Sequence, residues 1–563
     1  MAVIGIDLGT TNSAVGVWKD GEVKLIPNRL DEILTPSVVG LDDHGKVFIG
    51  RTAKERLLNY SSQTVATFKR MMGSDHKIRL NKQVFSAVEL SSLLLGSLKE
   101  DAEAFLGEAV TEAVISVPAY FNNHQREATK LAGELAGLNV ERLINEPTAA
   151  AIAYGLHEKN EGTFLILDMG GGTFDVSILE FFDGVMEVHA SAGDNFLGGE
   201  DFVDVMVDGA LSELNIDRSS LTPRQRQHIY MQMETAKRRI NQESSQAIVC
   251  DLGQTHHQFD VTPDWFVKMV TPLLLRIKHP ISRAIKDSGL SLKDIDEIIL
   301  VGGATRMSAF RSTVGKFFGR LPTCHIDPDT VVVHGAAIQA GLKSRDAALE
   351  DIVLTDVCPY TLGTAIANED NAPTGHYFMP IIERNSVVPI SIERQLFTAS
   401  DNQTVVHLKV YQGENRLVDK NIFLGEVIVD VPKGPRGQES INVRYSYNMN
   451  GLLEVDVTVV STQKKGYLLI EQTPGALSEE QKSALLEKLA RFKFHPRDQE
   501  GNKALIARGE RLYESNLGEK REYIAHLLAQ FDSVMEKQNR AEIKKARKEI
   551  TAIFDQIDQE DWI

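Results

Sequence analysis

Apolar residues follow three different spacings along the 563-residue chain. From residue 1 to about 347, short apolar runs alternate with stretches in which apolar and small residues recur at helical spacing, for example 113–117 and then 125–137. Strands that alternate with helices are typical of α/β domains. The pattern therefore predicts an α/β domain over residues 1–347.

The apolar spacing has a period of two from about residue 358 to 475. Val406, Leu408 and Val410 alternate with other side chains, and Asn450-Gly451 between two such runs is a strong hairpin signal. Strands with one apolar face and one polar face pack in pairs of sheets. We therefore expect a β-sandwich over 358–475.

Helical spacing begins at Ser478 and continues to the end of the chain. Ser478 and Gln481 fit a capping box, and apolar stripes begin at Leu485, Ile524 and Ile543. These stripes predict a short helical bundle over residues 476–563.

Charge and cysteine content narrow the class of protein. The formal net charge of −17 and the pI near 5.4 argue against nucleic acid or an anionic membrane as a partner. Cys250, Cys324 and Cys358 form no close pair, so the sequence indicates neither a disulfide framework nor a zinc site. No signal peptide and no run long enough to span a bilayer is recognised, and we expect a cytoplasmic monomer.

One phosphate-binding pattern occurs twice in the α/β domain. Asp7-Leu8-Gly9-Thr10-Thr11-Asn12 and Asp168-Met169-Gly170-Gly171-Gly172-Thr173 each follow an apolar strand and precede another one. Glycine allows a tight turn whose N–H groups approach phosphate oxygens, threonine adds hydroxyl donors, and an Asp at the strand end suits Mg²⁺. Two such hairpins in a duplicated domain predict a site that holds a nucleoside triphosphate from both sides.

A third glycine turn follows the apolar run 298–301. Gly302, Gly303, Ala304 and Arg306 in this turn suit close approach of an adenine or a ribose. Ordinary tight turns in an α/β core are the alternative explanation for each motif alone, and their joint occurrence argues against it.

With these motifs the chain resembles the DnaK, or heat-shock-70, chaperone family, whose nucleotide domain has the actin and sugar-kinase fold. The resemblance runs from Val3 to about Pro474 at the level of motifs, includes the segments 144–151 and 197–202, and continues more loosely to the end. The chain looks most like the short bacterial branch called HscC. The resemblance implies an actin-like ATPase domain, a peptide-binding β-sandwich and a helical lid.

The resemblance also implies a role for individual residues in ATP hydrolysis. Asp7 and Asp168 match the Mg²⁺ carboxylates, and potassium ions are a further cofactor to consider. Lys69, Glu146, Asp175 and Thr173 match catalytic positions; without the resemblance Lys69 is a surface lysine and Glu146 caps a helix. The matching nucleotide-binding residues are Gly9, Thr10, Thr11, Asn12, Gly170, Gly171, Gly172, Thr173, Gly198, Gly199 and Glu200.

The nucleoside is expected on one helix face. Glu234, Lys237 and Arg238 are spaced i, i+3 and i+4, which places them on the same side of a helix. A surface salt-bridge cluster is the plain alternative. In the family this face binds adenine and ribose, together with Asn241, which replaces a common serine, and Asp329.

A short apolar run, Ile352-Val353-Leu354, lies between polar flanks at 348–357, where the family has its interdomain linker. An ordinary strand is the alternative. Thr355 replaces the usual leucine, so we expect altered docking and coupling. Pro118 and Arg126 match a conformational relay, and Arg142 and Asp356 match positions that engage a J-domain co-chaperone.

A peptide site is expected in the β-sandwich, for extended apolar segments of unfolded polypeptides. Its expected residues are Thr364, Ala367, Ala399, Ser400, Val406 and Leu408. Sandwich core is the competing explanation for the last two. Thr364 and Ala367 replace larger apolar residues, which leaves substrate preference open.

The regions after Met72 and around Gln254 are shorter than in long relatives, from which we expect weakened dependence on a nucleotide exchange factor. Two other functions compete with an ATP-driven chaperone. A metabolic kinase would phosphorylate a sugar, and a filament-forming or non-hydrolysing ATP-binding protein would sediment as filaments or release no phosphate. The C-terminal β-sandwich and helical bundle have no role in sugar phosphorylation, which argues against the metabolic kinase.

Overall fold

A computed structural model gives the architecture. It describes residues 2–560 except 42, 44–46, 58–59, 155–160, 183–184, 241–244, 252–255, 324, 344–348, 350–352, 367–375, 450, 471–504, 507–508, 510–511, 514–517 and 538. The chain divides into two compact units. The first comprises 1–360 with 384–388 and 449–451, and the second comprises 361–383, 389–448 and 452–563.

Two larger sheets form the first unit, and they share one strand arrangement. Each sheet contains three antiparallel strands that are consecutive in the sequence. The first of these three also pairs with a parallel strand on its other edge. The sheets are β11(Asn139–Asn145)-β10(Glu112–Val117)-β1(Val3–Asp7)-β2(Asn12–Lys19)-β3(Glu22–Ile26), with β4(Thr35–Pro36) on β2, and β17(Glu297–Val301)-β12(Glu161–Met169)-β13(Phe174–Phe182)-β14(Val185–Asp194)-β18(Val353–Leu354). The repeated strand–turn–strand pattern of the sequence is confirmed in both sheets.

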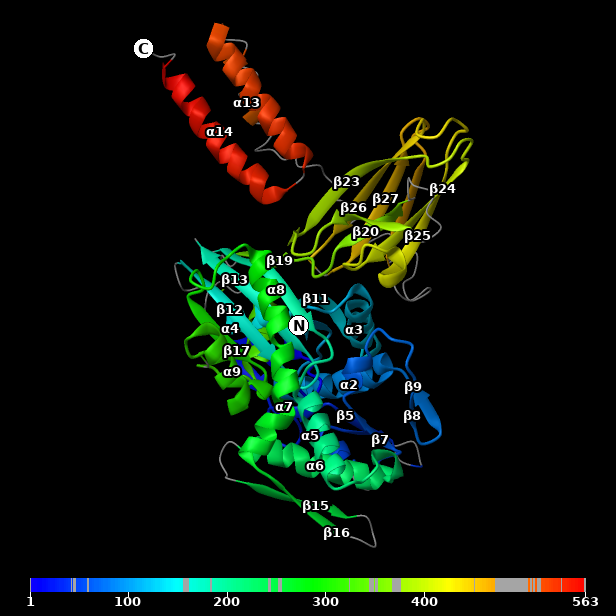
Figure 1. Ribbon diagram of the computed structural model, residues 1–563, viewed down its shortest axis with the longest axis vertical. Helices are drawn as coiled ribbons and strands as arrows, with labels where there is room; N and C mark the ends of the chain where they lie inside the picture. The colour runs from blue at the N-terminus through cyan, green and yellow to red at the C-terminus, as the bar shows by residue number, and fades with distance from the viewer. Residues whose placement is uncertain are drawn as a thin grey trace. The chain divides into compact units, whose positions relative to one another are not determined.

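Smaller sheets and helices surround these two. The small sheets are β6(Val47–Ile49)-β5(Val38–Leu41)-β7(Thr64–Ala66), β8(Ile78–Leu80)-β9(Gln83–Phe85), β15(Gln246–Asp251)-β16(His256–Val261) and β19(Asp356–Val357)-β22(Val387–Val388). The helices are α1(Arg51–Arg56), α2(Ala87–Leu106), α3(Asn123–Leu135), α4(Glu146–Ala153), α5(Gly199–Glu213), α6(Pro223–Arg239), α7(Pro263–Arg276), α8(Lys278–Ser288), α9(Ser308–Phe318) and α10(Val331–Lys343). Figure 1 shows α8 along β13 and the β15–β16 hairpin beyond α6.

Helices α4 and α10 connect the two sheets through a continuous apolar core. α10 packs on β1, β2 and β10, while α4 packs on α10 and on β12. Ile144 of one sheet and Ile166 of the other belong to the same buried cluster, which also contains Ala149 and Ala336. The two hairpin turns are therefore held on a common, tightly packed base.

The contact between α10 and α4 requires glycine at position 335. A Cβ at Gly335 would lie 1.8 Å from the backbone oxygen of Ala149, which is well inside van der Waals contact. We expect Gly335→Ala to lower the free energy of unfolding by about 2 kcal/mol, because the two helix backbones must separate. Chemical denaturation checks this, with Gly96→Ala as the control, since no atom lies within 4 Å of a Cβ there. Equal stability of the two variants would contradict the close packing.

The second unit contains two four-stranded sheets. They are β21(Tyr377–Ile382)-β20(Leu362–Ile366)-β24(Val405–Gln412)-β25(Ile422–Asp430) and β23(Ile390–Phe397)-β26(Ser440–Tyr447)-β27(Leu453–Val459)-β28(Lys465–Leu469). β25 packs on β27 and β28, and the Tyr445 hydroxyl donates a hydrogen bond to the Gly363 carbonyl at 3.0 Å. Leu408 and Val410 are buried while His407 and Lys409 are exposed, which confirms the period-two pattern in β24.

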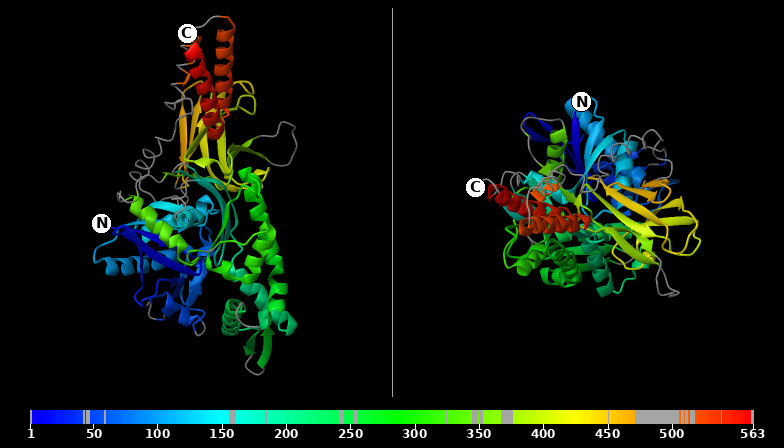
Figure 2. Two further views of the ribbon diagram at one scale, coloured as in Figure 1. Left: turned by 90° about the vertical axis from the view of Figure 1, so that its left-hand side faces the viewer. Right: turned by 90° about the horizontal axis from the view of Figure 1, so that it is seen from above.

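Two long helices, α13(Gly518–Glu536) and α14(Arg540–Glu560), complete the second unit. They lie side by side in both views of Figure 2 and share a buried cluster that includes Ile524, Phe531, Ile550 and Phe554. The two later helical stripes of the sequence are confirmed. The Ser478–Gln481 capping box and the stripe at Leu485 lie outside the described residues. No helix among the described residues is long and apolar enough to cross a membrane.

Candidate functional site

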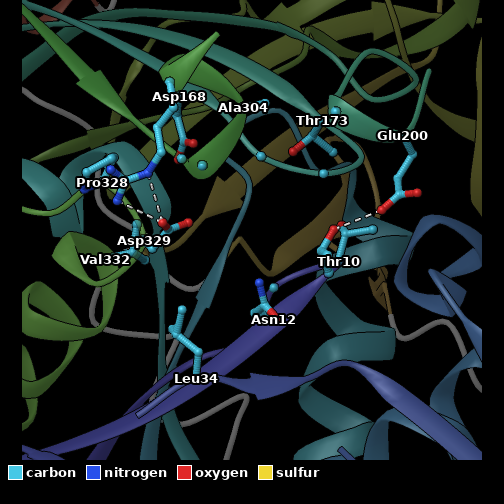
Figure 3. A pocket seen from close by; sticks show the side chains of 18 of the residues that line it. Thr10, Asn12, Leu34, Asp168, Thr173, Glu200, Ala304, Pro328, Asp329 and Val332 are labelled. Carbon is cyan, nitrogen blue, oxygen red and sulfur yellow. Dashed lines mark hydrogen bonds and ion pairs between the residues drawn. The ribbon is translucent and has the colours of Figure 1, made fainter. Parts of the chain in front are cut away.

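A cavity of about 370 Å³ lies in the first unit where the two hairpin turns meet. Its lining includes predicted residues from both sheets and from α6, as Figure 3 shows for Thr10, Asp168, Thr173 and Glu200. The predicted residues that line it are Asp7, Gly9, Thr10, Thr11, Asn12, Lys69, Glu146, Asp168, Gly170, Gly171, Thr173, Gly199, Glu200, Glu234, Lys237, Arg238, Gly302, Gly303, Ala304, Arg306 and Asp329.

The first turn is built around Gly9. Its N–H donates to the Ser13 hydroxyl at 3.1 Å, and its carbonyl accepts a hydrogen bond from the Ser37 hydroxyl at 2.7 Å. A Cβ at position 9 would lie 2.0 Å from the Asn12 backbone oxygen, so the turn can close only with glycine. This closure brings Thr10 and Thr11 to the cavity wall.

The second turn lies directly against the first. The Gly170 N–H donates to the Thr173 carbonyl at 3.2 Å, and a Cβ at Gly171 would lie 1.9 Å from the Thr11 hydroxyl oxygen. A Cβ at Gly198 would lie 2.5 Å from the backbone of Gly171 and Gly172. Backbone N–H groups can therefore approach a ligand closely from both sheets.

A single lysine is surrounded by carboxylates at one side of the cavity. Lys69 is only 3% exposed, and its Nζ donates to Glu146 Oε1 at 2.9 Å. This burial rules out a surface lysine. Glu146 is the first residue of α4, so it has a helix-end position as well as this contact.

Asp7, Asp168 and Asp175 lie near that pair. Asp168 and Asp175 are buried and Asp7 is half-buried, and of the three only Asp7 and Asp168 line the cavity. Burial, together with the nearby Glu146, raises the pKa of Asp7 and of Asp175 to about 7, while the Lys69 cation lowers both. The same causes raise the pKa of Asp168 well above its usual value. Several acidic groups thus share a small volume in which Lys69 is the neighbouring lysine, and Arg126 also lowers the pKa of Asp175.

The carboxylate oxygens fit a Mg²⁺ ion bound through water and phosphate. Oδ2 of Asp168 and Oδ2 of Asp175 are buried and accept no hydrogen bond, whereas Asp7 Oδ1 accepts one from the Ser116 hydroxyl at 2.8 Å. Within the described parts of the chain, no three His, Cys, Asp or Glu side chains gather closely enough to hold a metal ion by themselves. The remaining ligands would therefore be water and phosphate oxygens, which Mg²⁺ accepts readily.

The predicted helix face on α6 lines the opposite part of the cavity. Lys237 Nζ contacts Glu234 at 2.7 Å and donates to the Gly199 carbonyl at 2.8 Å, and Arg238 contacts Glu234 at 2.6 Å. Burial opposes ionisation of Glu234, but these two cations lower its pKa overall. The three residues share one face, as the spacing predicts, and all three line the cavity, although the Arg238 side chain is also 60% exposed.

Arg306 forms ion pairs with two aspartates, Asp327 and Asp329, which lie just before α10. Its guanidinium contacts Asp327 at 2.5 Å and Asp329 at 2.9 Å. The turn at 303–306 is a single 3₁₀ turn, and α9 begins only at Ser308. Asn241 lies outside the described residues.

Several lining residues were not predicted from the sequence. Leu34, Met307, Pro328 and Val332 give the cavity an apolar part, and an apolar residue near a turn carries no signal that distinguishes a ligand wall from a core. Glu200 accepts hydrogen bonds from the Thr11 hydroxyl at 3.1 Å and from the Tyr230 hydroxyl. No local pattern connects these three residues, which lie on three different elements.

The residues predicted for coupling lie near the segment 353–360. β18 pairs with β14, and the Thr355 N–H donates to the Met186 carbonyl at 3.0 Å. Asp356 is buried and accepts a hydrogen bond from Asn145 at 2.6 Å, while Asn145 accepts one from Arg126 at 2.7 Å. Pro118 is buried, Arg142 is half-buried, and Ile352 lies outside the described residues.

The residues predicted for peptide binding differ in exposure. Ala399 and Ser400 are exposed and Val406 is half-buried, whereas Thr364 and Leu408 are buried. The Thr364 hydroxyl donates to the Lys409 carbonyl at 2.8 Å, so this side chain belongs to the interior of the sheet. The sandwich-core explanation thus fits Leu408 and Thr364. Ala367 lies outside the described residues.

Comparison with known families matches almost the whole chain. A family model described as Hsp70 protein matches residues 3–562. The match covers the cavity, both sheets of the second unit and the C-terminal helices. The chain therefore belongs to the Hsp70 family, whose members are ATP-dependent chaperones that hydrolyse ATP, use Mg²⁺ and bind unfolded polypeptides.

Proposed function

We propose that this chain uses ATP hydrolysis in the first unit to control binding of extended apolar peptide segments in the second, with stimulation by a J-domain co-chaperone. One observation carries the proposal: two glycine turns from equivalent hairpins and the Lys69–Glu146 pair line the same cavity. Phosphoryl transfer needs positioned phosphates, charge neutralisation and an oriented water, and this set of groups supplies all three.

In this proposal the turns hold the β- and γ-phosphates. Thr10 and Thr173 donate from their hydroxyls, Thr11 donates once its hydroxyl turns away from Glu200, and the N–H groups of the glycine turns that are not bonded within the turn donate from the backbone. Asp7 and Asp168 would hold a Mg²⁺ ion through its water ligands, and the ion would supply positive charge at the phosphates. The nucleoside lies between the α6 face and the turn at 303–306, in a cavity that Arg238 and Arg306 line together with the apolar residues Leu34 and Val332.

Hydrolysis of the terminal phosphate is assigned to three side chains. Asp175 and Glu146 orient the attacking water and accept its proton, and Lys69 stabilises the charge that develops on the phosphoryl oxygens. The raised pKa of Asp175, about 7, suits proton transfer near neutral pH.

Each segment of the chain has its own role in this proposed function. Residues 1–347 form the ATPase domain, 348–357 the linker, 358–475 the peptide-binding domain and 476–563 the lid. Asp356 and Arg142 would engage the J-domain, and the loop at Ala399 and Ser400 would cover the peptide, for which their exposure is suitable. The two binding events share a coupling free energy.

Steady-state phosphate release tests the proposed function. We expect slow basal ATP turnover, a rise on adding an extended apolar peptide, and a further rise on adding a J-domain protein. The dissociation rate of a fluorescent peptide should increase when ATP replaces ADP. The proposal would be refuted if the protein did not bind ATP, or if the peptide dissociated at the same rate with ATP and with ADP. Transfer of phosphate to a hexose would indicate a metabolic kinase instead.

The proposal includes weak dependence on a nucleotide exchange factor. ADP release measured with a fluorescent analogue should change little when such a factor is added. Large acceleration would contradict this part alone and leave the chaperone assignment intact.

A further inference from the structure

The loop after β10 holds Asp175 by a backbone hydrogen bond. The Tyr120 N–H donates to Asp175 Oδ1 at 2.9 Å in a buried position. A Cβ at Gly193 would lie 2.7 Å from the Tyr120 Cβ and 2.9 Å from Asp175 Oδ1, so the loop and the carboxylate are packed without spare room. The orientation of Asp175 therefore depends on where the Tyr120 peptide lies.

Arg126 fixes this loop from one side. Its guanidinium donates to the Ala119 carbonyl at 3.0 Å and to the Phe121 carbonyl at 3.1 Å, on either side of Tyr120. These contacts hold the neighbouring peptide groups and leave the Tyr120 carbonyl and ring to other partners.

Tyr360 occupies that remaining position. Its hydroxyl donates to the Tyr120 carbonyl at 3.1 Å, and the side-chain amide of Asn195 donates to the same carbonyl at 3.0 Å. The rings of Tyr360 and Tyr120 lie 4.4 Å apart between centroids, with their planes tilted by 38°. The Tyr120 ring is held in turn by Arg283, which donates to the Tyr120 hydroxyl at 2.7 Å. Tyr360 thus contacts both the backbone and the side chain of the residue that binds Asp175.

Tyr360 lies at a special place along the chain. It is the last residue of the first unit before Thr361 begins the second, and it follows the β19 strand. The backbone beside it is fixed within the first unit, since the Cys358 N–H donates to the Ser386 carbonyl at 2.9 Å and the Asn385 N–H to the Cys358 carbonyl at 2.7 Å. A displacement of this segment would move the Tyr360 ring directly.

We propose that Tyr360 is a positioning residue for ATP hydrolysis, which holds Tyr120 so that its N–H keeps Asp175 aimed at the attacking water. The inference rests on the proposed function of the cavity. Tyr360 does not line the cavity, so its effect reaches the reaction only through Tyr120. It also gives the segment after the linker a direct mechanical connection to the carboxylate.

Two substitutions separate the hydroxyl from the ring. Tyr360→Phe keeps the ring contact and removes the hydrogen bond to the Tyr120 carbonyl, whereas Tyr360→Leu removes both. Because misalignment of a reacting group lowers the chemical step without weakening ligand binding, we expect kcat to fall about threefold in the first variant and about tenfold in the second, with KM for ATP unchanged. Tyr467→Phe, at an exposed tyrosine of β28, is the control and should match the wild type.

Amide hydrogen exchange gives a second measurement that needs no turnover. The Tyr120 amide should exchange faster in Tyr360→Leu than in the wild type, with Tyr360→Phe between them, because its hydrogen bond to Asp175 opens more often. Unchanged kcat in both variants, a change in KM as large as that in kcat, or unchanged exchange at Tyr120 would overturn the inference. A wild-type protein without ATPase activity would instead refute the proposed function, and the exchange rates would still decide whether Tyr360 holds Tyr120.

Discussion

Asp175→Asn is expected to lower kcat for ATP hydrolysis by about a hundredfold or more and at the same time to stabilise the nucleotide-free protein. Asparagine keeps an oxygen that can accept the Tyr120 N–H hydrogen bond, so the local geometry is preserved. It cannot accept the proton of the attacking water, and general-base catalysis contributes about 10² to 10⁴ in rate. Binding of ATP should remain, because the phosphates are held by the two turns.

The stability effect follows from the raised pKa of Asp175. In the folded protein this carboxyl keeps its proton up to pH about 7, while in the unfolded chain it loses the proton near pH 4. The folded state therefore binds more protons between these values, and the wild-type free energy of unfolding falls as the pH rises from about 4 to above 7. Asparagine removes this loss, and we expect a gain of about 2 kcal/mol at pH 8 that disappears near pH 4.

Two measurements on the same variant check this prediction. Phosphate release gives kcat, and denaturant unfolding of the nucleotide-free protein at pH 4.5 and pH 8 gives the stability difference. Asp260→Asn, at an exposed carboxylate of β16, controls for the loss of one negative charge. Wild-type turnover in Asp175→Asn would remove Asp175 from the mechanism, and a stability gain that is equal at both pH values would contradict the proton linkage.

Residues whose role depends only on local structure, such as a tight turn or one helix face, could be predicted from the sequence. The pattern at Gly9 and at Gly170 contains its structural reason locally, because a tight turn needs glycine and a strand end places the Asp. The face formed by Glu234, Lys237 and Arg238 is equally local, since helical spacing alone brings the three together. For Lys69 the sequence alone favoured a surface lysine, and only the resemblance pointed to the site.

Several residues that act through contacts between distant elements were not predicted. Leu34 and Val332 reach the cavity from separate segments, and Tyr230 meets Glu200 across two helices. Tyr360 contacts Tyr120 across 240 positions of the chain. Their roles depend on packing of whole elements, which neither residue type nor spacing encodes. In the second unit, period-two spacing predicts which residues face inward. It cannot distinguish a core residue from a residue that lines a pocket; Leu408, which is expected in the peptide site, is buried.

Lys69→Ala is expected to abolish measurable hydrolysis and, in contrast to Asp175→Asn, to destabilise the nucleotide-free protein. Lys69 is the cation that lowers the pKa of Asp7, Asp168 and Asp175, and its Nζ pairs with Glu146 in a buried position. Removing it leaves Asp7 and Asp168 without a compensating cation and Asp175 with Arg126 alone, and breaking a buried ion pair costs about 3 to 5 kcal/mol. Loss of charge stabilisation at the phosphoryl group should lower kcat by about 10² to 10³.

The opposite signs of the two stability effects make the Lys69 prediction specific. If Lys69 only filled space, Lys69→Met would restore both stability and turnover; we expect it to restore part of the stability and none of the turnover, because methionine carries no charge. Lys99→Ala, which removes an exposed hydrogen bond to the Gly137 carbonyl, is the matched control and should retain full activity.

The loss of stability in Lys69→Ala should also depend on pH. Since the carboxylates repel one another most when they are ionised, the decrease in the free energy of unfolding should be largest above pH 7 and should shrink as the carboxylates are protonated. Turnover within a few-fold of the wild type in Lys69→Ala would show that the carboxylates, and not the lysine, govern hydrolysis in this cavity.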